Sequence, residues 1–167
     1  MGTSLTFFKG KEFNEYLEYY ISERSGLPSI TMTTAIVNGL KALQAKNIAV
    51  ATVYSQEVTD LLIKVLKEYG LSPVNVEFLE TDISEVEKVS TDRLIELGSK
   101  AAKNVKADAL LISCRGLRTI EATKVLEEKL GIPVVSSAVA GAWATIRLVE
   151  DSGYAAEGGK LLQMSIK

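Results

Sequence analysis

The segment from 109 to 113 reads ALLIS, and the segment from 48 to 53 reads IAVATV. Short apolar runs of this kind are typical of strands that are buried on both faces of a parallel sheet. Two further strand-like runs lie at 74–79 and 133–136, and helix-like segments alternate with the four runs. This alternation predicts an α/β fold, with helices flanking both faces of a doubly wound, parallel four-stranded sheet.

The elements are distributed unevenly along the chain. Residues 48–149 supply four strands and four helices, which is enough for one complete α/β domain. Residues 1–47 supply two helix-like segments, at 11–24 and 34–45, and no clear strand. We therefore expect one complete domain, preceded by an incomplete region and followed by a tail from 150 to 167.

The composition excludes several kinds of catalytic site. The 167 residues include no histidine, which excludes Ser-His-Asp triads, Cys-His pairs and imidazole metal ligands. The single cysteine, Cys114, cannot form an intramolecular disulfide or a thiolate zinc site. Any mechanism must use carboxylates, lysines, arginines, tyrosines, hydroxyls, backbone amides or this one thiol.

Charge and hydropathy also limit the partners. The formal net charge is −2 and no lysine-rich tract is present, which argues against a nucleic-acid partner. No apolar run reaches the roughly 18 residues of a membrane span, and no signal-peptide pattern opens the chain. An unpaired thiol fits a reducing compartment, so we expect a cytoplasmic protein with no membrane partner.

Polar residues follow three of the predicted strands. Tyr54 follows the first strand, Cys114, Arg115 and Gly116 follow the third, and Ser136–Ser137 close the fourth. Ligands of open parallel sheets bind beyond the carboxyl ends of the strands, so these groups predict a site at one edge. The alternative is that they are only the polar loops that any doubly wound domain carries there.

The thiol of Cys114 is the first candidate for chemistry. It lies between a strand end and a helix start, with Arg115 and Arg118 nearby, and such surroundings lower a thiol pKa from about 8.5 toward neutrality. The alternative is a small buried core residue. The two arginines could hold a substrate carboxylate, or could form solvent-facing ion pairs with Glu121 or Glu150.

Hydroxyl groups are the second set of candidates. Thr3 and Ser4 precede an apolar stretch and could donate to an anion, although their spacing favours capping of a helix. Tyr54 could donate its phenol to an oxyanion, or simply pack with its hydroxyl at the rim of the core. The spacing alone leaves both alternatives open for the tyrosine.

Five segments resemble one known family. They lie in order along nearly the whole chain: MGTSLTFFKG at 1–10, TMTTAIVNGLKAL at 31–43, AVATVY at 49–54, ISCRGLRT at 112–119 and GIPVVSSAVAGAW at 131–143. Together they resemble the aspartate/glutamate racemase superfamily, in its arylmalonate decarboxylase and maleate isomerase branch. The family carries two pseudo-symmetric α/β domains with the substrate between them, and its racemases and isomerases place one cysteine on each side of the site.

The resemblance implies a cofactor-free decarboxylase of arylmalonate-type dicarboxylates. Cys114 stands at the place of the second family cysteine, and Gly2 stands at the place of the first, which is the pattern of the decarboxylase branch. Cys114 would then protonate one face of the enediolate that remains after loss of carbon dioxide. Thr3, Ser4, Tyr54, Arg115 and Gly116 would bind the substrate and its oxyanion. No metal, biotin or pyridoxal phosphate is implied.

Two departures from the family keep other interpretations open. Arg115 stands where the decarboxylase has glycine, and the LRT at 117–119 is nearer the isomerase-like members. The alternatives are a maleate isomerase or Asp/Glu-type racemase, and a truncated, non-catalytic carboxylate-binding domain. By the same resemblance, 1–47 is a remnant of the first domain and 150–167 returns toward it. Helices 11–24 and 34–45 would then expose apolar faces, which a homo-oligomer would bury.

Overall fold

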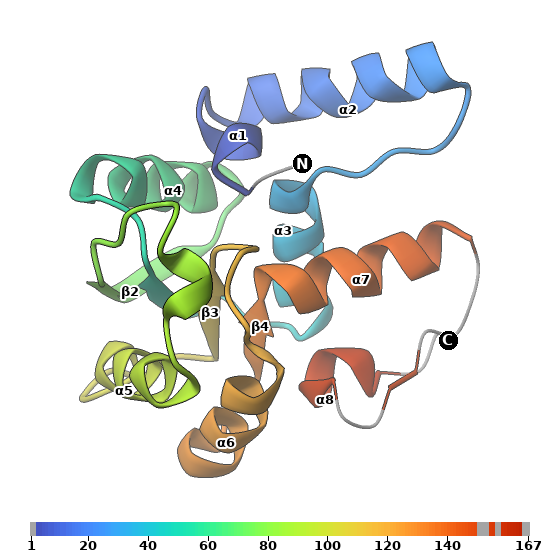
Figure 1. Cartoon of the computed structure of the whole chain (residues 1–167). Helices are drawn as coiled ribbons and strands as arrows, with labels where there is room; N and C mark the ends of the chain where they lie inside the picture. Colours follow the sequence, from blue (N-terminus) through green and yellow to red (C-terminus); the bar gives the residue numbers. More distant parts are fainter. Residues whose placement is uncertain (1–2, 150–153, 156–157, 165–167) are drawn as a thin grey trace.

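The computed structural model describes residues 3–149, 154–155 and 158–164 of the chain, and a parallel sheet forms its centre (Figure 1). The strand order is β2-β1-β3-β4, and all three neighbouring pairs are parallel. The strands are β1 (Asn47–Thr52), β2 (Ser72–Phe78), β3 (Ala109–Ser113) and β4 (Val134–Ser136). The predicted four-stranded parallel sheet is therefore confirmed, and β3 has the bounds expected from ALLIS.

Helices cover both faces of the sheet. Alternate residues of β1 divide between two cores, with Ile48 and Val50 in one and Ala49 and Ala51 in the other. The first core also receives α3, α4, α7 and α8, and the second receives α5 and α6, which confirms the doubly wound arrangement (Figure 1). The helices are α1 (Thr3–Phe7), α2 (Lys11–Ser25), α3 (Met32–Ala42), α4 (Gln56–Glu68), α5 (Thr91–Ala101), α6 (Ile120–Leu130), α7 (Ser137–Leu148) and α8 (Gly159–Leu162), with a 3₁₀ turn, η1, at Val86–Lys88.

Several helix boundaries differ from the sequence-based expectation. Helix α3 begins two residues before the predicted position, because the Thr31 side chain accepts a hydrogen bond from the Thr34 N–H. Helix α7 begins at 137 and not at 140, because the Ser136 hydroxyl accepts from the Val139 N–H. The same Ser136 hydroxyl lies 2.8 Å from that of Thr119, which makes no capping hydrogen bond to α6.

The expectation that the helix at 34–45 exposes its apolar face is wrong. Ile36, Val37 and Leu40 are buried in the first core, where α3 packs against α7 and β4. Phe7 of α1 is buried in the same core. The N-terminal region is therefore joined to the sheet domain by apolar packing through α1 and α3. The assignment of 1–47 as the remnant of a separate domain stays a prediction.

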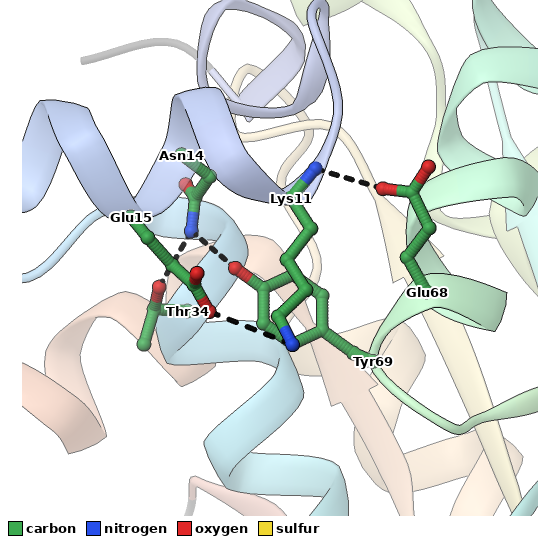
Figure 2. Close-up of polar contacts among 6 residues, drawn as sticks. All are labelled: Lys11, Asn14, Glu15, Thr34, Glu68 and Tyr69. Atoms are coloured by element: carbon green, nitrogen blue, oxygen red, sulfur yellow. Dashed lines mark hydrogen bonds and ion pairs between the residues drawn. The ribbon is translucent and has the colours of Figure 1, made fainter.

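Helix α2 lies outside this layer (Figure 1). Of its fifteen residues, all of which the structure describes, only Asn14 is buried, while Tyr16, Tyr19 and Tyr20 are exposed. The Asn14 amide nitrogen donates to the hydroxyls of Thr34 and Tyr69, each at 2.8 Å (Figure 2). These polar contacts, here called the polar clasp, hold α2 on α3 and on the end of α4. Of the two helices expected to expose an apolar face, only α2 leaves large hydrophobic side chains exposed.

Candidate active site

The order of the sheet creates a switch point between β1 and β3. The chain leaves β1 through α4 on one face, and it leaves β3 through α6 on the other face. The two loops therefore diverge from adjacent strand ends, which opens a crevice where ligands of doubly wound sheets bind. Tyr54 follows β1 and Cys114 follows β3, so both lie at this crevice.

A cavity of about 430 Å³ occupies the switch point, and all six residues that the family resemblance assigns to the site line it. The loops after β1 and β3 contribute Tyr54, Cys114, Arg115 and Gly116, and α1 contributes Thr3 and Ser4. The remaining lining residues are Val53, Ser55, Val58, Thr81, Ile83 and Val86. Residues separated by more than a hundred positions in the sequence thus meet at one polar and apolar pocket.

The surroundings of Cys114 contradict one prediction. Burial raises the pKa of its thiol, and this effect exceeds the lowering by the Gly116 backbone, the Tyr54 phenol and the Arg115 charge. A lowered pKa was expected from an adjacent helix N-terminus, but α6 begins only at Ile120. The thiol is therefore protonated at neutral pH, and it is suited to give a proton rather than to attack as a thiolate.

The backbone at Cys114 is held by the first residue of α7. The N–H of Cys114 donates a 3.2 Å hydrogen bond to the hydroxyl of Ser137, at the start of α7. Ser136 and Ser137 were predicted to belong to the site, but neither lines the cavity. Both are buried, and their hydroxyls cap α7 and anchor the Cys114 loop.

Tyr54 presents a neutral phenol to the cavity. Its hydroxyl lies 3.4 Å from that of Ser113, and its ring packs edge-on against Phe7 with the ring centroids 6.0 Å apart. Burial is the largest effect on the pKa of Tyr54 and raises it far above the ordinary value. A phenol that keeps its proton can donate a hydrogen bond to an oxyanion.

Thr3 brings an unpartnered hydroxyl to the same cavity. The residue is only 3% exposed, and its Oγ1 makes no hydrogen bond within the described part of the chain. Its hydroxyl therefore does not cap a helix, contrary to what the spacing favoured. It is one of the polar groups beside Tyr54 that oppose the rise in the phenol pKa. Ser4 is half-buried beside it, and Gly2 lies outside the described residues.

The arginines are exposed. Neither Arg115 nor Arg118 forms an ion pair with another described residue, so the pairing weighed for Glu121 is not formed. Glu121 instead accepts a 3.3 Å hydrogen bond from Thr91, and Glu150 lies outside the described residues. Arg115 lines the cavity and Arg118 does not. Arg115 is thus a cation at the cavity that is available to a carboxylate.

Sequence reasoning missed the loop between β2 and α5. Thr81, Ile83 and Val86 of this loop line the cavity, and Ile83 is 92% exposed there. Nothing in their spacing indicates a site, because only the return of the chain toward α5 brings them over the ends of β1 and β3. Ser113 was also missed, because it reads as the last residue of a buried strand.

The described ranges contain neither a membrane-spanning helix nor a cluster of metal-ligating side chains. No helix there is long and apolar enough to cross a membrane. No group of three or more histidine, cysteine, aspartate or glutamate side chains gathers there in a way that could hold a metal ion. The prediction of a cofactor-free reaction is not tested by this observation and stays a prediction.

Comparison with known proteins agrees with the fold and with the site. A family model described as arylmalonate decarboxylase matches residues 1–162. An arylmalonate decarboxylase from Bordetella bronchiseptica is 39% identical over 168 residues, which cover 99% of this chain and 70% of that protein. A maleate isomerase from Geobacillus stearothermophilus is 29% identical over 140 residues, which cover 81% of this chain and 54% of that protein.

Solved structures show the same architecture. A crystal structure of arylmalonate decarboxylase is similar with a TM-score of 0.90 at 38% identity, covering 99% of this chain and 73% of that chain. A liganded double mutant of arylmalonate decarboxylase is similar with a TM-score of 0.94 at 37% identity. The match covers 98% of this chain and 71% of the mutant's chain. A mutant of the Nocardia farcinica maleate cis-trans isomerase shares the fold, with a TM-score of 0.87 at 23% identity. The match covers 97% of this chain and 69% of the isomerase chain.

The parallel sheet and its switch-point cavity thus define an α/β enzyme domain of the racemase superfamily, in the branch that holds arylmalonate decarboxylases and maleate isomerases. The chain belongs to the arylmalonate decarboxylase family, and it is an enzyme of the decarboxylase type. The family resemblance read from the sequence is confirmed. The roles of the individual site residues stay proposals.

Proposed function

We propose that this protein decarboxylates α-substituted malonates without a cofactor and uses Cys114 as the proton donor. One observation carries the proposal: a protonated thiol and three hydroxyl groups, those of Thr3, Ser4 and Tyr54, line one cavity at the switch point of the sheet. Decarboxylation of a malonate needs these two kinds of group, because the enediolate must be stabilised and then protonated.

The lining of the cavity fits the two ends of such a substrate. Its hydroxyls and the exposed guanidinium of Arg115 suit the carboxylates. Val53, Val58, Ile83 and Val86 add apolar surface that suits an aryl or alkyl substituent. A pocket with a few polar groups on an otherwise apolar lining is typical of small-molecule sites.

The proposed reaction balances in two steps. The bond between the α-carbon and one carboxylate breaks, carbon dioxide leaves, and its bonding electrons remain as an enediolate. The hydroxyls of Thr3, Ser4 and Tyr54 donate hydrogen bonds to the two enediolate oxygens. The Cys114 thiol then transfers its proton to the α-carbon, which yields a monocarboxylate and a thiolate that takes a proton from water.

A single thiol also limits the stereochemistry. Cofactor-free racemisation needs an acid and a base on opposite faces of the carbanion, and Cys114 is the only cysteine in the chain. A proton delivered from one side yields one enantiomer. We therefore expect a chiral product from a prochiral, disubstituted malonate.

The first test is release of carbon dioxide from methyl(phenyl)malonate by the wild type and by Cys114→Ser. We expect the serine variant to lose at least about 100-fold in turnover, because a hydroxyl is a far weaker acid than a thiol. Arg115→Gln and Arg118→Gln form a matched pair, since only Arg115 lines the cavity. The first should raise KM and the second should leave it unchanged.

Two outcomes would contradict the proposal. Release of carbon dioxide that does not change in Cys114→Ser would remove the role given to the thiol. Conversion of maleate to fumarate, without turnover of any malonate, would favour the isomerase alternative. The similarity to maleate isomerases is the observation behind that alternative. Binding of malonates without turnover of either substrate would favour the non-catalytic alternative.

A further inference from the structure

We propose, on the basis of the decarboxylase function above, that Thr6 is a positioning residue that holds Thr3 at the cavity. Thr6 does not line the cavity at the switch point, and it is a fully buried residue of α1. Its hydroxyl connects the backbone of Thr3 to the first turn of α3. The proposed role is therefore to act on the reaction only through Thr3.

The hydrogen bonds around Thr6 have one consistent direction. Its Oγ1 donates to the carbonyl oxygen of Thr3 at 2.8 Å, and it accepts from the N–H of Thr33 at 3.2 Å. Its distance to the Thr33 hydroxyl is 2.7 Å. A hydroxyl has one proton to donate and two lone pairs. Because that proton is used on Thr3, the hydroxyl of Thr33 must be the donor in the third contact.

The chain of donors therefore runs from Thr33 through Thr6 to the Thr3 carbonyl, and it saturates the Thr6 hydroxyl. Its far end is anchored, because Thr33 lies in the first turn of α3 and is 3% exposed. The network thus connects a core helix to a helix of only five residues. A helix this short has little stability of its own, so contacts to the rest of the fold must set its position.

The group that Thr6 positions is the buried hydroxyl of Thr3, next to the Tyr54 phenol. Thr3 lines the cavity, and its hydroxyl is buried and makes no hydrogen bond within the described residues. A buried hydroxyl without a partner costs stability, and a substrate oxygen would satisfy it. The direction of the Thr3 hydroxyl depends on the position of the Thr3 backbone, and Thr6 holds that backbone through its hydrogen bond to the Thr3 carbonyl oxygen. An error of about 1 Å in such a group is enough to cost up to about 100-fold in rate.

A double-mutant cycle with Thr6→Val and Thr3→Val tests this role. Valine keeps the shape of threonine and removes the hydroxyl. We expect Thr6→Val to lower kcat/KM on methyl(phenyl)malonate about tenfold, and Thr6→Ser to restore most of the loss. In the Thr3→Val background, Thr6→Val should change kcat/KM less than about twofold, because the group that it positions is absent.

Thr59→Val provides the matched control. Thr59 is also a buried threonine, it lies on α4, and its hydroxyl makes no hydrogen bond among the described residues. It should leave kcat/KM unchanged in both backgrounds. Equal losses from Thr6→Val in the wild-type and Thr3→Val backgrounds would overturn the proposal, because a general loss of structure acts independently of Thr3.

The same cycle can be measured without turnover, as the dissociation constant of phenylacetate, a carboxylate that cannot lose carbon dioxide by this route. If no malonate is decarboxylated but the binding effects of Thr6→Val and Thr3→Val are non-additive, the proposed function fails and the positioning role stands. If turnover occurs and the effects are additive, the positioning role alone fails. If neither turnover nor binding occurs, both are overturned.

Discussion

The amide nitrogen of Asn14 on α2 lies 2.8 Å from the phenolic oxygen of Tyr69, which follows α4 and is 55 positions away in the sequence (Figure 2). The same nitrogen donates to Thr34, and the Asn14 carbonyl oxygen accepts a 2.6 Å hydrogen bond from Thr31. The only buried side chain of α2 is thus a polar one with partners on both sides of its amide. The attachment of α2 therefore depends on hydrogen bonds more than on apolar packing.

Asn14→Ala should lower the free energy of unfolding by about 2–3 kcal/mol, because one buried and two part-buried hydrogen bonds are lost and Thr31 stays buried without its partner. Tyr69→Phe removes only one of these bonds and should cost about 1 kcal/mol. Urea denaturation of both variants measures the difference. A loss in Asn14→Ala no greater than that in Tyr69→Phe would show that the clasp is not the main attachment of α2.

Tyr54→Phe should lower kcat about 100-fold and leave the fold intact. The ring that packs on Phe7 is retained, and only the hydroxyl that faces the cavity is removed. Steady-state kinetics on methyl(phenyl)malonate measure the effect. Tyr69→Phe is the matched control, since it removes a phenol outside the cavity and should leave kcat unchanged. Equal kcat values for the two variants would remove Tyr54 from the oxyanion site.

The thiol of Cys114 should react slowly with iodoacetamide at neutral pH. Burial raises its pKa above the ordinary value of 9.0, so the reactive thiolate is scarce until the solution is alkaline. The rate of alkylation, followed by mass spectrometry from pH 6 to 10, should rise at a higher pH than for an unfolded cysteine peptide. A rate that is already maximal near pH 7 would contradict a protonated thiol.

The same shift predicts a dependence of stability on pH. Below the ordinary thiol pKa, the folded and unfolded chains both keep the proton, and stability is at its full value. As the pH rises further, the unfolded thiol ionises before the buried one does, so the free energy of unfolding decreases. Cys114→Ser should remove this part of the decrease above about pH 9, where burial of Tyr54 acts in the same direction at still higher pH.

Gly116→Ala should reduce stability by about 1 kcal/mol, because the added Cβ would lie 3.0 Å from the Cγ1 atom of Val86. Val86 is buried in η1 at the side of the cavity. Val86→Ala in the same chain should recover part of the loss, and Val86→Ala alone serves as the control. Additive losses in urea denaturation would show that the two side chains do not compete for space.

Much of the fold follows from local patterns. The runs ALLIS and IAVATV are apolar except for Ser113 and Thr52, and only a strand covered on both faces can bury such a run. They form most of β3 and β1. The absence of histidine and the single cysteine limited the chemistry before any geometry was known. The candidate residues after the strands could also be named, because parallel strands bring their carboxyl ends to one edge.

Only the tertiary structure shows how deeply each group is buried and which distant parts of the chain lie together. The thiol pKa is raised and not lowered, because burial is a property of all the neighbours of Cys114 and outweighs the charge next to it. Thr81, Ile83 and Val86 reach the cavity only through the path of the loop between β2 and α5. The place of Thr3 depends on Thr33, thirty positions away, because a five-residue helix takes its position from its contacts. Local patterns determine which helices and strands form, whereas long-range packing determines which side chains share a cavity and whether each one is protonated.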